Sequence, residues 1–153
     1  MTRFGPLSTS PEGLILGDPG RKHLLLTPAG MNYRAHAAPP QFFAWNEIEG
    51  ATIDLPTSRF RFPALAVGVA SWAVAFSSGE SIHLDPDDGS VTIVSRGDEV
   101  LLDIGRHHVG GYWRASVAAA QRLLERFIVE PQSRELLNHP EELLRAVTAS
   151  VRR

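Results

Sequence analysis

The sequence predicts an α+β domain, with about seven or eight short antiparallel strands first and helices at the C-terminal end. Two observations predict this order. Eight of the 11 prolines precede residue 64, where short apolar runs alternate with turn residues, a pattern typical of strands. After Gly105 only two prolines remain, and the apolar residues recur at helical spacing. Strands followed by helices favour a curled sheet with a long helix packed against it.

The size and composition of the chain limit the classes of protein. Its 153 residues suffice for one domain with a hydrophobic core, and the formal net charge of −2 argues against a strongly basic nucleic-acid binder. The sequence has no cysteine, which excludes disulfides, thiolate metal sites and a cysteine nucleophile. No secretory signal is evident, and the longest apolar stretch, Ala64–Phe76, is too short to span a membrane. We therefore expect a cytoplasmic protein without a transmembrane segment.

Apolar runs bounded by turns predict the strands of the first half. Residues 1–11 have the pattern of an N-terminal tail, so the domain is expected to begin at residue 12. Pro39 and Pro40 place residues 37–41 in a loop, because proline cannot donate to a strand ladder. The predicted strands are Gly13–Gly17, His23–Thr27, Met31–His36 and one strand over Phe42–Leu55 that is interrupted near Asn46.

Four further strands are expected to follow as an antiparallel meander. In the last of them, Val100, Leu102 and Ile104 alternate with Leu101 and Asp103, the two-residue period of a strand. The turn at Arg96–Asp98 separates this strand from the one before it. The four predicted strands are Trp72–Phe76, Ile82–Leu84, Val91–Ile93 and Val100–Ile104.

Two amphipathic helices are expected after the strands. The first covers Tyr112–Glu130, where apolar residues recur every three or four positions and Pro131 ends the pattern. The second covers Asn138–Ser150, within a helical extension at residues 131–153. Asn138 and Glu141 have the spacing of a capping box.

Two local patterns resemble bacterial pleckstrin-homology-like (PH-like) domains. Leu24–Met31 has an early strand and a turn ending in Gly30, and Phe43–Ile48 has an aromatic residue followed after a short gap by an isoleucine that starts a strand. The resemblance covers roughly residues 12–130. It implies a partly open antiparallel barrel plugged at one end by the long helix, and a binding or scaffolding role.

Two groups of residues are candidate contacts for a protein or peptide partner. Arg59, Phe60 and Arg61 interleave cations with an aromatic ring, a combination that binds anionic groups and rings. Arginines are also enriched at interfaces. Those expected on the polar face of the first helix are Arg114, Arg122 and Arg126.

Two alternative functions stay open. Arg21 and Lys22 form a small basic turn that would suit an anion or a lipid headgroup in a small-ligand or lipid-binding protein. A metal-dependent hydrolase would need a cluster of imidazole and carboxylate groups, which bind metal ions and act as bases. The candidate ligands are His83, Asp103, His107 and His108. A solvated strand face or backbone hydrogen bonding at a strand–helix junction is the simpler explanation of these residues.

The favoured interpretation is a non-enzymatic bacterial interaction module that binds a protein or peptide, with a second copy of the chain as one such partner. The partner would lie along an exposed strand edge or in the groove between barrel and helix. No cofactor and no catalytic residue are assigned. Nucleic acid is not expected as a partner, and peripheral lipid contact is a minor alternative.

Overall fold

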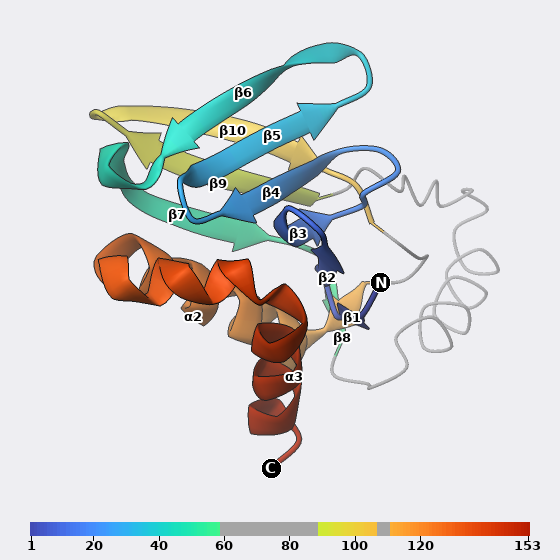
Figure 1. Ribbon diagram of the computed structural model, residues 1–153. Coiled ribbons are helices and arrows are strands. Elements are labelled where there is room, and N and C mark those ends of the chain that lie inside the picture. The colour runs from blue at the N-terminus through green and yellow to red at the C-terminus, as the bar shows by residue number, and fades with distance from the viewer. Residues whose placement is uncertain (59–88, 107–110) are drawn as a thin grey trace, which may run out of the picture.

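The computed structural model describes residues 1–58, 89–106 and 111–153. Over these residues the chain forms an antiparallel sheet of six strands, an antiparallel sheet of three strands and a short parallel strand pair. The α-helices follow near the C-terminal end of the chain (Figure 1). The α+β class with antiparallel sheets and C-terminal helices is therefore confirmed.

Six strands form the first sheet, and each pairs antiparallel with the next one along the chain. Strands β3, β4 and β5 confirm the strands predicted at Gly13–Gly17, His23–Thr27 and Met31–His36. Leu14 and Leu16 point from β3 into the core, as the two-residue period of a strand requires. The six strands are β1 (Arg3–Phe4), β2 (Leu7–Ser10), β3 (Gly13–Gly17), β4 (His23–Thr27), β5 (Gly30–Ala35) and β6 (Ala38–Ala44).

The segment expected to be a tail, residues 1–11, instead supplies β1 and β2. Leu7 pairs in register with Leu16 of β3, and both side chains are buried. Neither strand shows the alternation of apolar and polar residues that indicates a strand in a sequence. Hydrogen bonding to a neighbouring strand, β2 for β1 and β3 for β2, stabilises them instead. The N-terminal residues therefore belong to the sheet.

The segment expected to be a Pro-Pro loop, residues 37–41, lies mostly within strand β6. Strand β6 is the last strand of its sheet and pairs only with β5 there. A proline that lacks an N–H group is tolerated on such an edge, because the outward side of the strand needs no ladder hydrogen bond. Pro39 and Pro40 also hinder another strand from pairing with this edge.

The second sheet contains β7 (Ile48–Asp54), β9 (Gly89–Ser95) and β10 (Asp98–Ile104), in the order β10-β9-β7. The predicted strands at residues 91–93 and 100–104 are confirmed within β9 and β10. The strand predicted over Phe42–Leu55 is two strands, β6 and β7, because the 3-10 helix η1 (Trp45–Glu47) carries the chain from one sheet to the other. The strands predicted at Trp72–Phe76 and Ile82–Leu84 lie outside the described residues.

A short parallel pair, β8 (Thr57–Ser58) and β11 (Tyr112–Trp113), leads into the helices. The Tyr112 N–H donates to the Pro56 carbonyl at 2.8 Å. Gly111 has a φ of 62°, and a Cβ there would lie 2.8 Å from the same carbonyl oxygen. Only glycine adopts this φ without steric cost and leaves room for the carbonyl oxygen. Gly111 therefore allows β11 to pair with β8 directly before the first long helix.

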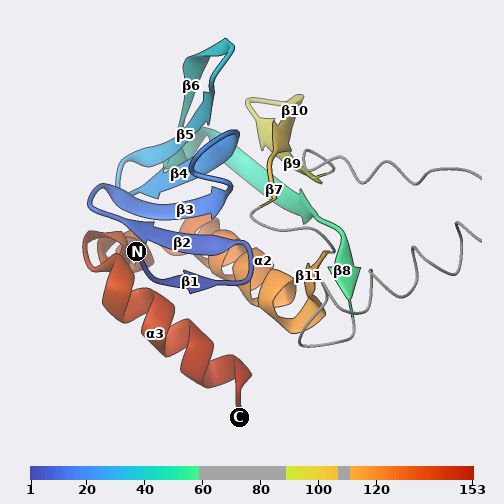
Figure 2. The same cartoon turned by 90° about the vertical axis from the view of Figure 1, so that its right-hand side faces the viewer.

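The helical part of the chain packs along the open side of the two sheets. Figure 2 shows the sheets on either side of the molecule, with α2 running beneath them and α3 beside β1. The stripe predicted for the first helix is confirmed, because Val117, Leu124 and Phe127 are buried. The helices are α2 (Arg114–Val129), the 3-10 helix η2 (Pro131–Asn138) and α3 (Pro140–Val151).

One hydrophobic core joins both sheets to the helices. The ring of Trp45, between the sheets, lies 5.7 Å from the ring of Phe127 on α2, and the Trp45 indole N–H donates to the Thr27 carbonyl at 2.7 Å. The Tyr33 hydroxyl of the first sheet donates to the Asp103 carbonyl of the second at 2.8 Å. Aromatic packing and polar bonds thus hold the two sheets together.

Helix α2 covers the free edge of β7 through one side chain. The Gln121 carbonyl oxygen accepts from the Ile53 N–H at 2.8 Å, and the Gln121 amide donates to the Ala51 carbonyl at 2.9 Å. This pair of bonds reproduces what a neighbouring strand would provide. The exposed edge is thereby closed to further strand pairing at this point.

Replacing Gln121 with Leu removes both bonds but keeps the bulk of the side chain. We expect the free energy of unfolding to fall by about 1–3 kcal/mol, because two part-buried backbone groups lose their partners. Urea unfolding followed by circular dichroism measures the change. The exposed neighbour Arg122→Ala is the control, with an expected effect within about 0.5 kcal/mol. Equal stability of Gln121→Leu and the native chain would contradict the role assigned to Gln121.

Candidate functional site

Helix α3 separates two grooves on the surface of the described residues. The apolar groove lies between α2, η2 and α3 and has a volume of about 560 Å³. Its apolar lining consists of Leu123, Leu136, Leu143, Ala146 and Val147, and its polar lining of Arg126, His139, Glu142 and Ser150. The basic groove lies between the N-terminal segment and α3 and has a volume of about 440 Å³. Its lining consists of Thr2, Arg3, Glu141, Arg145, Thr148, Ala149 and Arg152.

The helical period explains why one helix borders two grooves of different character. Residues at positions i, i+3, i+4 and i+7 share one face of a helix. On α3 this spacing gives the apolar groove Leu143, Ala146, Val147 and Ser150. The same spacing gives the basic groove Arg145, Thr148, Ala149 and Arg152. Leu144 lies on neither face and is fully buried in the core, so α3 is anchored between its two exposed faces.

Glu141, in the first turn of α3, ties the helix to the N-terminal strands. The Thr2 hydroxyl donates to Oε2 of Glu141, and the Thr9 hydroxyl donates to Oε1 at 2.6 Å. The Thr2 backbone N–H in turn donates to the Thr9 hydroxyl oxygen at 2.9 Å. The bonds from Thr2 and Thr9, together with the charge of Arg145, lower the pKa of the Glu141 carboxyl. The carboxylate therefore stays ionised and is already engaged by two donors.

The capping box predicted for Asn138 and Glu141 is wrong. The residue that precedes α3 is His139, and no side chain caps the helix. The Asn138 side chain donates instead to Glu135 at 3.0 Å. Glu141 binds the two threonine hydroxyls instead, so its carboxylate is engaged by the N-terminal segment rather than by the start of its own helix.

The three arginines predicted on the first helix are exposed on α2, as expected. Of these, Arg126 lines the apolar groove, where its Nε donates to Glu130 at 3.0 Å. Arg114 and Arg122 line neither of the two grooves. The structure therefore brings one of the three predicted contacts to a groove.

The basic turn of Arg21 and Lys22 connects β3 to β4. Asp18 organises the turn, since its carbonyl accepts from the Arg21 N–H at 3.1 Å and its carboxylate accepts from the Gly20 N–H at 2.9 Å. The Lys22 carbonyl accepts from the Gly105 N–H at 2.9 Å, so the turn is fixed to the end of β10. A carboxylate within the turn offsets part of its positive charge.

Only one of the four predicted metal ligands belongs to the described residues. Asp103 is exposed on β10, whereas His83, His107 and His108 lie outside the described residues. Across the described ranges, histidine, aspartate and glutamate side chains nowhere gather in threes as a metal-binding cluster requires. The predicted contact segment Arg59, Phe60 and Arg61 also lies outside the described residues.

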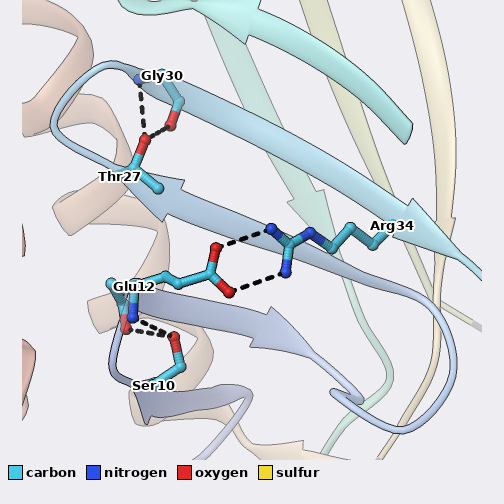
Figure 3. Close-up of polar contacts among 6 residues, drawn as sticks. Ser10, Glu12, Thr27, Gly30 and Arg34 are labelled. Carbon is cyan, nitrogen blue, oxygen red and sulfur yellow. Dashed lines mark hydrogen bonds and ion pairs between the residues drawn. The ribbon is translucent and has the colours of Figure 1, made fainter.

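The outer face of the first sheet carries a buried histidine. Arg34 of β5 forms a two-pronged ion pair with Glu12 across the strands, at 2.9 and 3.3 Å (Figure 3). His23, opposite Arg34 in register, is 7% exposed, and its Nδ1 has no hydrogen-bond partner. Burial and the charge of Arg34 lower the pKa of His23, although Asp18 and Glu12 act in the opposite direction. His23 is therefore a buried neutral side chain.

Only part of the basic groove has a signal in the sequence. Arg145 and Arg152 are seven positions apart, a spacing that places two residues on one face of a helix. Nothing local to Arg3 indicates that it lies opposite α3, because the strand that carries it was expected to be a tail. Figure 1 shows the N-terminal strands beside α3.

No protein-family model matches the chain, and no curated protein or solved structure matches it either. Among the described residues, no helix combines the length and the apolar character needed to cross a membrane. The function is therefore inferred from the two grooves and the residues that line them.

The bonds that hold α3 to β2 predict a loss of stability when the Thr9 hydroxyl is removed. Thr9→Val keeps the shape of the side chain but removes a donor to Glu141 and the acceptor of the Thr2 N–H. We expect the free energy of unfolding to fall by about 1–2 kcal/mol, measured by urea unfolding. Thr52→Val, at an exposed position of β7, is the matched control and should change stability by less than about 0.5 kcal/mol. An equal effect of the two variants would refute the anchoring role.

The buried His23 predicts that stability falls in mild acid. Its pKa is lower in the folded state than in the unfolded chain, so the unfolded chain binds more protons as the pH falls through about 6.5. The free energy of unfolding should therefore decrease from about pH 7.5 to about pH 5.5, above the range where carboxylates titrate. His23→Gln should flatten this dependence in urea unfolding at both pH values. A variant that retains the full native slope would show that another group is responsible.

Proposed function

We propose that the protein is a non-enzymatic interaction module that binds a short amphipathic helix of another protein in the apolar groove. The observation that carries this proposal is the groove itself. Five apolar side chains line it, and it lies open between two exposed helices. Apolar grooves between helices are a recurring binding site for amphipathic helices, whose apolar residues enter the groove at helical spacing.

The scaffold we propose for this module is the PH-like partly open barrel that the sequence resembles. Three features support it: antiparallel sheets of six and three strands, a core shared between them, and the helix α2 packed along β7 after the last strand. Strands β1 and β2 and helix α3 are additions to that scaffold under this proposal. Of these, β1 and α3 line the basic groove, and α3 also forms one wall of the apolar groove.

Exposed apolar side chains support binding at this groove. Leu136, in the lining, is 39% exposed, and Ala146 of the same lining is also exposed. Exposed apolar side chains that line one groove mark an interaction site more often than scattered ones do. Covering them with the apolar face of a helix removes this surface from water.

The charged residues that line the apolar groove indicate which kind of helix would bind there. Glu142 lines the groove and forms no ion pair within the described part of the chain, so a cation beside the apolar face of the bound helix would complement it. Arg126 on the opposite wall already pairs with Glu130. A helix as long as α3, which has 12 residues, would span about 18 Å of the groove.

A charge placed in the groove tests the proposal. Leu136→Glu puts a carboxylate in the apolar lining, at a position exposed enough for the fold to tolerate it. The tagged full chain is used to capture proteins from an extract of its own host, and crosslinks locate the captured partner on the chain. We expect capture to fall by about tenfold, because a desolvated charge opposes binding of an apolar face.

Leu101→Glu is the matched control, since Leu101 is 66% exposed on β10 and lines neither groove. The expected result is a partner that crosslinks to α2 or α3, persists with Leu101→Glu and is lost with Leu136→Glu. Retained capture by Leu136→Glu, or crosslinks that map to the sheets alone, would overturn the proposal. Thermal unfolding of both variants verifies that they remain folded.

A further inference from the structure

The second groove beside α3 differs from the first in charge. We propose that the basic groove binds an acidic, extended segment of the same partner, so that the partner straddles α3. This inference rests on the proposed function in one respect, that the ligand is a protein. It adds the chemistry of that protein: an amphipathic helix joined to a stretch of Asp and Glu residues.

Three arginines from two elements converge on the basic groove. Arg3 comes from β1, Arg145 comes from α3, and Arg152 is the residue that directly follows α3. All three are exposed, and none forms an ion pair with another described residue. Other arginines of the described chain do form ion pairs, namely Arg34 with Glu12, Arg96 with Glu47 and Arg126 with Glu130. The groove therefore gathers three cations that form no ion pair within the described chain, although Glu141 lies near enough for the charge of Arg145 to lower its pKa.

The one carboxylate in the basic groove does not cancel this charge. Glu141 accepts hydrogen bonds from Thr2 and Thr9, which occupy both of its oxygens. Three guanidinium groups against one carboxylate leave the groove positive, in a chain whose formal net charge is −2. An acidic ligand would therefore be attracted to this groove although the chain as a whole carries a small net negative charge.

The spacing of the arginines favours an extended ligand over a single small anion. Arg145 lies on α3, and Arg152 directly follows the last residue of α3 with helical backbone angles, so the two are about 10.5 Å apart along the helix axis. An extended peptide rises about 3.3 Å per residue, so a segment of about four residues covers this distance and can carry more than one carboxylate along it. Ala149 lies between them, and its small side chain leaves room for the backbone of the bound segment.

Binding of a model acidic peptide to the full-length protein tests the inference. The probe is a fluorescein-labelled peptide of about eight residues in which Asp or Glu alternates with Ser, long enough to span the groove. Fluorescence anisotropy at low salt should show saturable binding that weakens strongly at high salt, because these charges are exposed. We expect Arg145→Ala and Arg152→Ala each to weaken binding about threefold and the double variant about tenfold.

Arg96→Ala is the charge-matched control for each single variant. Arg96 lies in the turn between β9 and β10, outside the basic groove, so the peptide should bind Arg96→Ala as it binds the native chain. Ala149→Glu is a second variant that keeps all three arginines and adds a carboxylate between two of them. It should weaken peptide binding about tenfold by repulsion.

Three other outcomes would each overturn the inference. An absence of peptide binding at low salt, or equal weakening by Arg96→Ala and Arg145→Ala, would show that the groove does not select acidic peptides. Tight binding of pyrophosphate that displaces the peptide completely would identify a small-anion site instead. Failure here is distinct from failure of the proposed function, because peptide binding depends on Arg145 and Arg152, whereas capture of the partner depends on Leu136.

Discussion

Both grooves depend on one contact, the engagement of Glu141 by the hydroxyls of Thr2 and Thr9. It joins the first turn of α3 to residues that are 139 and 132 positions away in the sequence. Because a charged acceptor strengthens each bond, the pair holds α3 against β1 and β2 although Glu141 itself is exposed. The apolar side of α3, with Leu143 and Leu144 in the core and Val147 and Val151 packed against it, holds the helix from the other direction. The position of α3 in turn defines the walls of both grooves.

Much of the fold could be predicted from the sequence, because hydrophobic periodicity is a local signal. Strands β3, β4, β5, β9 and β10 and helix α2 follow that signal, and the structure confirms them. The errors in the sheet have one physical origin. Strands β1 and β2 and the first part of β6, with Pro39 and Pro40, are stabilised by hydrogen bonds with a neighbouring strand although their own residues carry no strand pattern. Pairing between strands overrides local propensity in such segments.

The candidate site was predictable only in part, for a related reason. Arg126 was expected to contact a partner, and its groove position agrees with that expectation, while the contact itself remains a prediction. The basic groove combines Arg3 with residues of α3 that lie far along the chain, and only the folded sheet brings them together. Glu141 shows the same effect: its sequence position indicates a helix cap, whereas its carboxylate binds the N-terminal strands. Contacts of long sequence separation are invisible to patterns read from single segments.

The location of the grooves also bears on how a PH-like scaffold would be used here. The turn between β3 and β4 has only Arg21 and Lys22, and Asp18 and the backbone of Gly105 hold it in place. It is a poor match for a highly charged ligand, whereas the basic groove collects three arginines outside the sheets' loops. Under the proposed function, a ligand that contacts both faces of α3 would gain affinity from apolar burial in one groove and from charge in the other. The helix between the two grooves would then be the element that decides which partner binds.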